Sequence, residues 1–278
     1  MSAIHNSNHH FTPRTREDRW RIAKRKKQIL NFCASWLVAL LAAFGFAGSA
    51  VSGPSGGVVT SGQGVISQQG VDTTIRQQSQ RLDIQWKDFS TNVNESINFM
   101  QPNVSSLAIN RVIGGVPSQL RGALNANGRV FILNNAGVTF FGTSQVNVGA
   151  LIASTADRIT DKGDLLELTG DMNGAVINRG DIKISNGGFA ILAAPYVENS
   201  GMITADLGQI ALASTTAMTV DLRGDGLITF AMTDGTAKKI GVTNTGTLQA
   251  RSGTVMISGD MASDVVSGVV NLEGIVDA

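Results

Sequence analysis

Short runs in which apolar and polar residues alternate dominate the chain after Gly53. The clearest run extends from Arg81 to Phe89, where Leu82, Ile84 and Trp86 alternate with polar or charged residues. An alternation with a period of two is typical of strands that bury one face. Similar short runs are found at Val65–Ile66, Thr73–Arg76 and Ser96–Met100. The pattern therefore predicts an all-β protein built from many short strands, with Trp86 packed in its core.

A nearly continuous apolar stretch from Gly128 to Phe141 is interrupted by Asn134-Asn135-Ala136-Gly137. Asparagine and glycine are frequent in tight turns because both tolerate backbone conformations that other residues avoid. We therefore expect two strands joined by a turn at this position.

The second half of the chain contains an internal repeat. Its glycines, Gly180, Gly201, Gly246 and Gly274, are separated by 21, 45 and 28 residues, and an apolar strand lies on each side of them. Such spacings correspond to one or two turns of a β-solenoid, in which each coil buries its apolar face against the next. The four copies are Val176–Ile182, Val197–Ile203, Val242–Leu248 and Val270–Val276.

The repeat also predicts how its corners are stabilised. We expect the repeat glycines to supply a positive φ angle at each corner, and stacked asparagines to pair their side-chain amides along the solenoid axis. The irregular spacing indicates that some coils carry loops, as around Asp221 to Gly241.

The first fifty residues differ from the rest of the chain. Eight basic residues between Arg14 and Lys27 precede an apolar run from Ile29 to Ala47, and small residues follow as far as Ala50. This order is typical of a secretory signal peptide, with cleavage after Ala50 or, alternatively, after Ala47. An apolar run of this length also approaches what is needed to span a bilayer, so an uncleaved anchor is the alternative.

Removing this leader changes the charge and the available chemistry. It takes away 8 of 22 basic and 2 of 21 acidic residues, which leaves 14 against 19 and a formal charge of −5. All three histidines and the single cysteine, Cys33, also lie in the leader. We therefore expect no nucleic-acid binding, no cofactor, no metal site, no Ser-His-Asp or Cys-His catalysis and no disulfides after cleavage.

Several motifs between residues 57 and 156 carry a specific resemblance. They are Gly64–Gly70, Ile84–Phe89, Glu95–Phe99, Gln101-Pro102, Ala108–Val112, Gly114-Gly115, Pro117–Leu120, Ala126–Asn134 and Gly149–Thr155. Together they resemble the haemagglutination-activity domain of two-partner secretion (TPS) exoproteins, the family of filamentous haemagglutinin and the high-molecular-weight adhesins. The chain departs from the family's Asn-Pro-Asn-Gly turn, because Asn134-Asn135-Ala136-Gly137 stands in its place.

The resemblance implies a right-handed parallel β-helix, a single-stranded solenoid with an N-terminal cap and short extra antiparallel strands. It also implies export by the general secretory translocon into the periplasm, followed by recognition by an outer-membrane transporter with polypeptide-transport-associated domains. The exported protein would be secreted or surface-bound, commonly as an adhesin with a host-cell or glycan ligand. The domains expected are a leader over 1–50, a TPS domain with its cap over 51–160, and β-helix coils over 161–278.

Candidate functional residues fall into two groups. Asn110, Arg111, Asn134, Asn135 and Gly137 are candidates for contact with the transporter, although holding turns of the cap is the more conservative interpretation. The second group consists of the glycines at the repeat corners, Gly180, Gly201, Gly246 and Gly274.

Two other functions compete with export. Asp157, Asp161, Asp164 and Glu167 are the carboxylates that a polysaccharide-cleaving β-helix enzyme would need, but we expect them in a solvated loop and expect no enzyme. The third interpretation is a self-sufficient small adhesin that binds its ligand along exposed faces of the β-helix.

Overall fold

The computed structural model describes residues 53–163, 165–170, 173–221, 228–231, 241–259, 270–272 and 274–278. Residues Val51–Ala278 form one compact unit, distinct from Met1–Ala50. The expected leader and both cleavage positions, Ala50 and Ala47, lie outside the described residues. In the part of the chain that the structure describes, no helix is long and apolar enough to cross a membrane.

The described residues form strands and no helices, as the alternating pattern predicts. Strands of the first sheet, in spatial order, are β1 (Val58–Ser61), β4 (Arg81–Trp86), β6 (Leu107–Val112), β9 (Arg129–Leu133), β12 (Ala150–Ser154), β17 (Phe189–Ala194), β20 (Gln209–Ser214) and β25 (Thr254–Gly259). Those of the second sheet are β2 (Gly64–Gln69), β3 (Asp72–Gln77), β5 (Ser96–Met100), β8 (Ala123–Ala126), β11 (Gln145–Val148), β16 (Asp181–Ile184), β19 (Met202–Thr204), β24 (Thr247–Gln249) and β27 (Ile275–Asp277).

Two further sheets complete the unit. The third sheet contains β7 (Ser118–Leu120), β10 (Val138–Phe140), β15 (Ala175–Asn178), β18 (Tyr196–Asn199), β23 (Gly241–Asn244) and β26 (Val270–Leu272). The outer sheet contains β13 (Arg158–Lys162), β14 (Leu165–Thr169), β21 (Ala217–Asp221) and β22 (Ile228–Ala231), all antiparallel.

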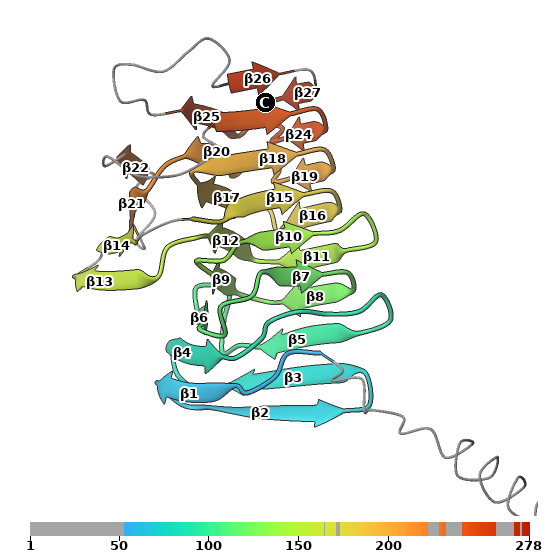
Figure 1. Cartoon of the computed structure of the whole chain (residues 1–278), viewed down its shortest axis with the longest axis vertical. Helices are drawn as coiled ribbons and strands as arrows, with labels where there is room; N and C mark the ends of the chain where they lie inside the picture. The colour runs from blue at the N-terminus through green and yellow to red at the C-terminus, as the bar shows by residue number, and fades with distance from the viewer. Residues whose placement is uncertain are drawn as a thin grey trace, which may run out of the picture. The chain divides into compact units, whose positions relative to one another are not determined.

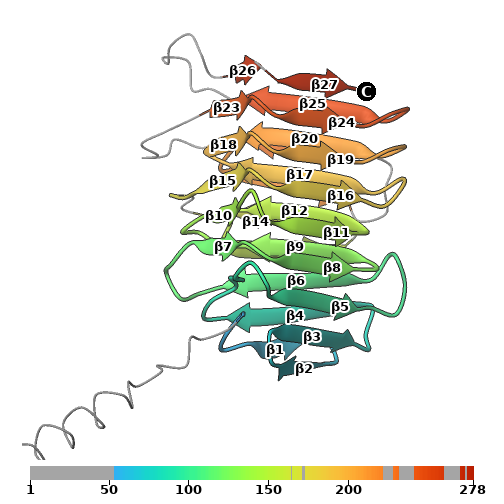
Figure 2. The same cartoon turned by 90° about the vertical axis from the view of Figure 1, so that its right-hand side faces the viewer.

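The chain winds through the third, second and first sheets in turn, and each coil pairs in parallel with the coil before it. Val146 of β11, for example, lies in register between Leu124 of β8 and Ile182 of β16. The strands therefore stack in ladders, with β1 and β2 at one end and β26 and β27 at the other (Figures 1 and 2). This arrangement is a parallel β-helix, which confirms the fold predicted from the repeat.

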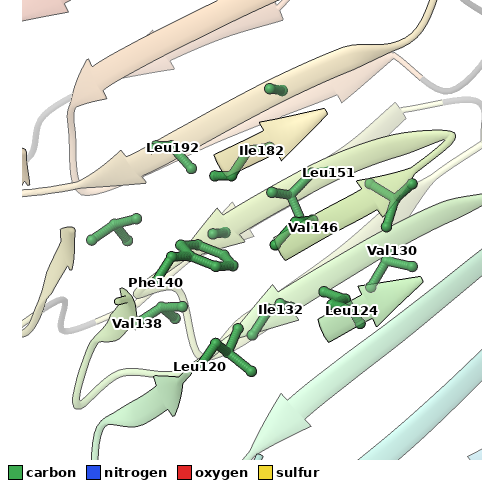
Figure 3. Close-up of a cluster of buried hydrophobic side chains, with 14 of the residues drawn as sticks. Leu120, Leu124, Val130, Ile132, Val138, Phe140, Val146, Leu151, Ile182 and Leu192 are labelled. Carbon is green, nitrogen blue, oxygen red and sulfur yellow. The ribbon is translucent and has the colours of Figure 1, made fainter. Parts of the chain in front are cut away.

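Apolar side chains from all three sheets fill the interior of the coils. Trp86 is buried as predicted, and its ring centroid lies 5.4 Å from that of Phe89. Stacking coils remove these side chains from water at about 25 cal/mol per Å² of apolar area, which a single coil cannot do alone. Figure 3 shows ten core positions: Leu120, Leu124, Val130, Ile132, Val138, Phe140, Val146, Leu151, Ile182 and Leu192.

Two antiparallel strands cap the first coil. β1 pairs antiparallel with β4, and β2 pairs antiparallel with β3, whereas the later neighbours in both sheets are parallel. Val59 of β1 and Ile66 of β2 pack against the interior. β1 and β2 therefore cover the apolar end of the solenoid, which would otherwise face water.

The outer sheet covers the outward face of the first sheet. Leu166 and Leu168 of β14 and Met218 and Val220 of β21 are buried against outward-facing residues of five coils. Those partners are Leu107, Ile109, Phe131, Leu133, Ile152, Ile191, Ala193, Ala211 and Ala213. Strands β9, β12, β17 and β20 are thus buried on both faces, which explains their nearly continuous apolar sequences.

Two predicted loops contain strands of this outer sheet. The segment with Asp157, Asp161 and Glu167 was expected as a loop, but it forms the β13–β14 hairpin. The expected loop from Asp221 to Gly241 includes β22, which pairs with β21, while residues 222–227 and 232–240 lie outside the described residues. The expectation of a loop at Asp157–Glu167 was wrong because β13 is almost wholly exposed and polar, so its sequence lacks the apolar alternation of a strand with one buried face.

Candidate functional site at the amino-terminal cap

A buried carboxylate anchors the turn before β5. The Glu95 residue is only 5% exposed, and its Oε2 atom accepts hydrogen bonds from the backbone nitrogens of Asn92 at 2.7 Å and Gly53 at 2.9 Å. The side-chain amide of Asn92 donates to Glu95 Oε1 at 2.8 Å. These charge-assisted bonds hold the start of the described chain against the second coil.

A polar cleft of about 400 Å³ opens beside this carboxylate. Asp88, Glu95 and Arg121 are its ionisable residues, and the Arg121 guanidinium lies 3.6 Å from the centroid of the Phe141 ring. Its other lining residues are Gly53, Ser90, Thr91, Asn92, Val116, Pro117 and Gln119.

Two buried glutamines close the next corner of the cap. Gln101 Nε2 donates to Gln77 Oε1 at 3.1 Å, and Gln101 Oε1 accepts from the backbone nitrogen of Gly128 at 2.9 Å. Gln77 Nε2 donates to the Leu107 carbonyl at 3.1 Å. The pair thus satisfies backbone groups of three successive coils at a corner where the strands separate.

Asn110, a candidate for transporter contact, is completely buried. It points inward from β6, where its Oδ1 accepts from Trp86 Nε1 at 3.0 Å and its Nδ2 donates to the Phe131 carbonyl at 3.2 Å. In the folded domain, Asn110 therefore connects the first, second and third coils. Arg111 points to the opposite side of the strand and is partly exposed.

Asn134, Asn135 and Gly137 form the predicted turn between β9 and β10. The Gly137 nitrogen donates to the Asn134 carbonyl at 2.8 Å, and Gly137 has a φ of +120°. Asn134 is buried and donates to the Val116 carbonyl and to Ser118 Oγ. Asn135 donates weakly to Asp157 Oδ2 at 3.4 Å. These contacts give the turn residues a structural role within the cap and the adjacent coil.

The predicted asparagine ladder is present in the repeat. Asn178 Nδ2 donates to Asn199 Oδ1 at 2.8 Å, and Asn199 Nδ2 donates to Asn244 Oδ1 at 2.7 Å. All three residues are fully buried. The amides satisfy one another along the axis, so a polar row can exist inside an apolar core.

The repeat glycines lie at the corners, but the physical reason differs from the one predicted. Gly180, Gly201 and Gly246 do not have positive φ angles. A Cβ atom on Gly201 would lie only 2.2 Å from the Gly180 carbonyl oxygen, and one on Gly246 only 2.1 Å from that of Gly201. A Cβ on Gly274 would meet the Gly246 carbonyl oxygen in the same way. The expectation of positive φ was therefore wrong, and close backbone approach between coils is what requires glycine here.

The carboxylates considered for catalysis do not converge. Asp161 Oδ1 accepts from Arg81 Nη1 at 2.6 Å, and Glu167 Oε2 lies 2.8 Å from Lys162 Nζ. Asp161 is opposite Leu166 in the hairpin, whereas Glu167 is opposite Thr160, so the two carboxylates lie on different faces of the sheet. Asp164 lies outside the described residues. In the described part of the chain, no group of three or more His, Cys, Asp or Glu residues is placed to hold a metal ion.

Burial and hydrogen bonding to carboxylates shift the pKa of Arg81 in opposite directions. Burial lowers the pKa of the Arg81 guanidinium, but hydrogen bonds to Asp83 and Asp161 raise it, and the net shift is upward. Burial alone lowers the pKa of Arg129.

Sequence reasoning missed the polar centre of the cap. Gln77 lies in phase with the buried Thr73 and Ile75 on β3, and this phase was the available signal for a buried glutamine. Glu95 immediately precedes β5 and is in phase with the buried Ile97 and Phe99, so the same signal was available for its burial, whereas its partners Asn92 and Gly53 could not be read from alternation.

Fold and site together define a capped parallel β-helix with a polar cleft at its amino-terminal end. The sequence model of the TPS secretion domain family matches residues 50–278. The chain belongs to this family, so it is the secretion-directing domain of an exported protein. A TPS domain implies a cognate outer-membrane transporter and passage across the outer membrane.

Individual relatives agree with this assignment. The chain is 34% identical over 218 residues to a heme/hemopexin-binding protein of Haemophilus influenzae strain KW20 Rd, covering 74% of this chain and 24% of the relative. A second Haemophilus influenzae heme/hemopexin-binding protein is 40% identical over 98 residues, or 34% of this chain and 11% of the relative. The chain therefore spans about a quarter or less of these relatives.

A solved structure shows the same fold. The crystal structure of the HMW1 secretion domain from Haemophilus influenzae matches with a TM-score of 0.63 and 28% identity, covering 74% of this chain and 57% of that one. The match confirms the resemblance to secretion domains of the high-molecular-weight type.

Proposed function

We propose that residues 51–278 are recognised in the periplasm by an outer-membrane transporter with polypeptide-transport-associated domains, and that they nucleate β-helix folding outside the cell. The leader would direct passage through the general secretory translocon and would be cleaved after Ala50, with Ala47 as the alternative. The family match begins at residue 50, which supports this boundary.

The order of strand pairing is the observation that carries this proposal. Apart from β7, β25, β26 and β27 at the ends of their sheets, the strands that follow the antiparallel cap pair in order with the coil before and the coil after. A chain that emerges amino terminus first can therefore complete its cap and then add coils in the order of their synthesis. Each added coil buries apolar surface, and this free energy biases movement outward without ATP.

The outer sheet would form later in this sequence. β14 follows β12 in the chain, but its partner β21 follows β20, two coils further on. The apolar inner face of β14 therefore gains its complete cover only after both coils have folded. This late step would lock the stacked coils together after they have left the transporter.

Secretion of a cross-linkable chain tests the proposal. The cleaved chain contains no cysteine, so Gln145→Cys with Asp181→Cys introduces one pair at positions that are in register on neighbouring coils and exposed to solvent. Adjacent strands place the Cα atoms within the range that a disulfide can bridge. We expect transporter-dependent release to fall at least tenfold when the disulfide forms, and to recover under reducing conditions.

Two comparisons complete this experiment. Either cysteine alone should be secreted normally, and all variants should stay in the cell when the transporter is absent. Sequencing the amino terminus of the released chain identifies the cleavage position. Normal release of the cross-linked, folded chain would contradict outward folding as the driving force, and release without any transporter would contradict the assigned partner.

A further inference from the structure

The described chain begins in the polar cleft beside Glu95. Gly53 lines this cleft, has a φ of +72°, and donates its backbone N–H to Glu95 Oε2 at 2.9 Å. The residue that directly precedes the cap is therefore held against a carboxylate that is almost fully buried.

Negative charge exceeds positive charge in this cleft. Asp88 and Glu95 contribute two carboxylates, whereas Arg121 is the single basic residue among the lining residues. Ser90 donates to Asp88 Oδ1 at 2.6 Å, and the Arg121 guanidinium donates to Gln119 Oε1 at 3.0 Å and lies over Phe141. Arg121 forms no ion pair with Asp88 among the described residues, and the net charge of the lining is negative, which favours a cation in the cleft.

A buried hydroxyl beside Gly53 gives independent support. Thr73 is 1% exposed, and its Oγ1 has no hydrogen-bond partner among the described residues. A Cβ atom built on Gly53 would lie 3.1 Å from this oxygen. Buried polar atoms almost always have a partner, so a polar group is expected close to the Gly53 position.

We propose that this cleft binds the α-amino terminus that is created when the leader is cleaved after Ala50. The inference depends on that proposed cleavage, which makes Val51 the first residue. Two residues span at most about 7 Å, so an ammonium group on Val51 can reach the carboxylates that surround Gly53. Its three N–H donors suit a cleft lined by carboxylate, hydroxyl and amide oxygens.

Leader removal would then complete the cap. A chain that retains its leader has an uncharged peptide group at the Val51 position. Cleavage after Ala47 would move the charge by three residues, or about 10 Å, away from the same carboxylates. The cleft therefore distinguishes a chain that begins at Val51 from a longer one.

Two purified chains test this inference, one beginning at Val51 and one at Gly48, which adds three uncharged natural residues. We expect the Val51 chain to melt about 2–4 °C higher. We also expect an aminopeptidase to remove its first residue at least tenfold more slowly. Glu95→Gln should abolish both differences, whereas Glu167→Gln, on the outer sheet, should preserve them.

The outcomes are separable from those of the secretion experiment. If Glu95→Gln does not fold, Asp88→Asn provides the second test because the Asn92 and Gly53 bonds to Glu95 remain. Equal melting and equal trimming of the two chains would overturn the inference even if secretion is transporter-dependent. A secreted chain that begins at Gly48 would overturn it as well, while leaving the export function intact.

Discussion

The cap and the repeat coils solve the same structural problem in different ways. Both must satisfy backbone and side-chain polar groups at corners where strands separate. The cap uses individual residues with unlike partners, such as Glu95 with Asn92 and Gly53, and Asn110 with Trp86. The coils use identical residues stacked on themselves, as in the Asn178–Asn199–Asn244 ladder.

This difference determines how a substitution spreads. In the ladder, one residue serves as donor to the next coil and acceptor from the previous one, so its loss affects two neighbours. In the cap, each polar residue bonds to unlike groups, as Asn110 does to Trp86 and to the Phe131 carbonyl, so the partners affected differ from site to site. The coils should therefore be sensitive to changes in the repeated positions, whereas the cap should be sensitive at positions that no repeat identifies.

The largest expected loss of stability comes from a substitution at one of the repeat-corner glycines, which stack on one another from coil to coil. Gly201→Ala places a Cβ within 2.2 Å of the Gly180 carbonyl oxygen, so neighbouring coils must separate. We expect a loss of about 3 kcal/mol in the free energy of unfolding, measured by urea denaturation.

A substitution at a second glycine, Gly187, distinguishes the effect of steric crowding from the effect of an unfavourable backbone conformation. Gly187 has a φ of +78°, but no atom lies within 4 Å of a Cβ built on it. Gly187→Ala should therefore cost only about 1 kcal/mol, the price of a strained φ. A loss at Gly201 no larger than that at Gly187 would contradict close approach between coils as the reason for glycine at the repeat corners.

The next effect compares the ladder with the cap directly. Asn199→Leu leaves Asn178 Nδ2 without its asparagine acceptor and Asn244 Oδ1 without its donor, and we expect a loss of about 2–3 kcal/mol. Asn110→Leu leaves Trp86 Nε1 without its acceptor and should cost about 1–2 kcal/mol. Urea denaturation measures both losses.

The fluorescence of Trp86 distinguishes a change in the cap from a change in the repeat coils. Trp86 is the only tryptophan beyond the leader, because the other two are Trp20 and Trp36. Asn110→Leu should shift the native emission of Trp86, whereas Asn199→Leu should leave it unchanged. A larger loss from Asn110→Leu than from Asn199→Leu would contradict the view that repetition concentrates sensitivity in the coils.

Most of the repeated structural features could be predicted from the sequence, whereas few of the features that occur only once could be. The period-two pattern and the spaced glycines identified strands, coils and the asparagine ladder because each depends on a local, recurring requirement. The reason for glycine was misjudged, since a contact between Gly201 and the Gly180 carbonyl joins residues 21 positions apart and is invisible to local pattern. The β14–β21 pairing was missed for the same reason, because some fifty residues separate Leu166 from its partner Val220.

The polar residues of the candidate site also divide into those that could be identified from the sequence and those that could not. Asn110 and Asn134 stood out as part of the family resemblance, and the structure places both in buried hydrogen-bond arrangements. Glu95 was not identified as a buried anchor, although it is in phase with the buried Ile97 and Phe99, because its partner Gly53 lies 42 residues earlier in the chain. The phase of a strand can indicate that a polar residue is buried, but the partner that satisfies it follows from tertiary packing.

The smallest expected effect lies where the first coil meets the outer sheet. Arg81 of β4 donates to Asp161 of β13 at 2.6 Å and also binds Asp83 on its own strand. The Asp161 side chain is 59% exposed, so water and salt weaken the attraction. Asp161→Asn should reduce the free energy of unfolding by about 0.5 kcal/mol at low salt, and by almost nothing at about 1 M salt.

A pair within the hairpin provides the control for this contact. Glu167→Gln removes the ion pair with Lys162, which joins β14 to β13 without involving any coil. Both variants should lose little stability, but only Asp161→Asn should increase amide hydrogen exchange in β4 relative to β6, because only Asp161 contacts the first coil. A loss above about 2 kcal/mol that persists at high salt would show that the Arg81–Asp161 pair is a principal anchor of the outer sheet, and the apolar cluster around Leu166 and Leu168 would then be secondary.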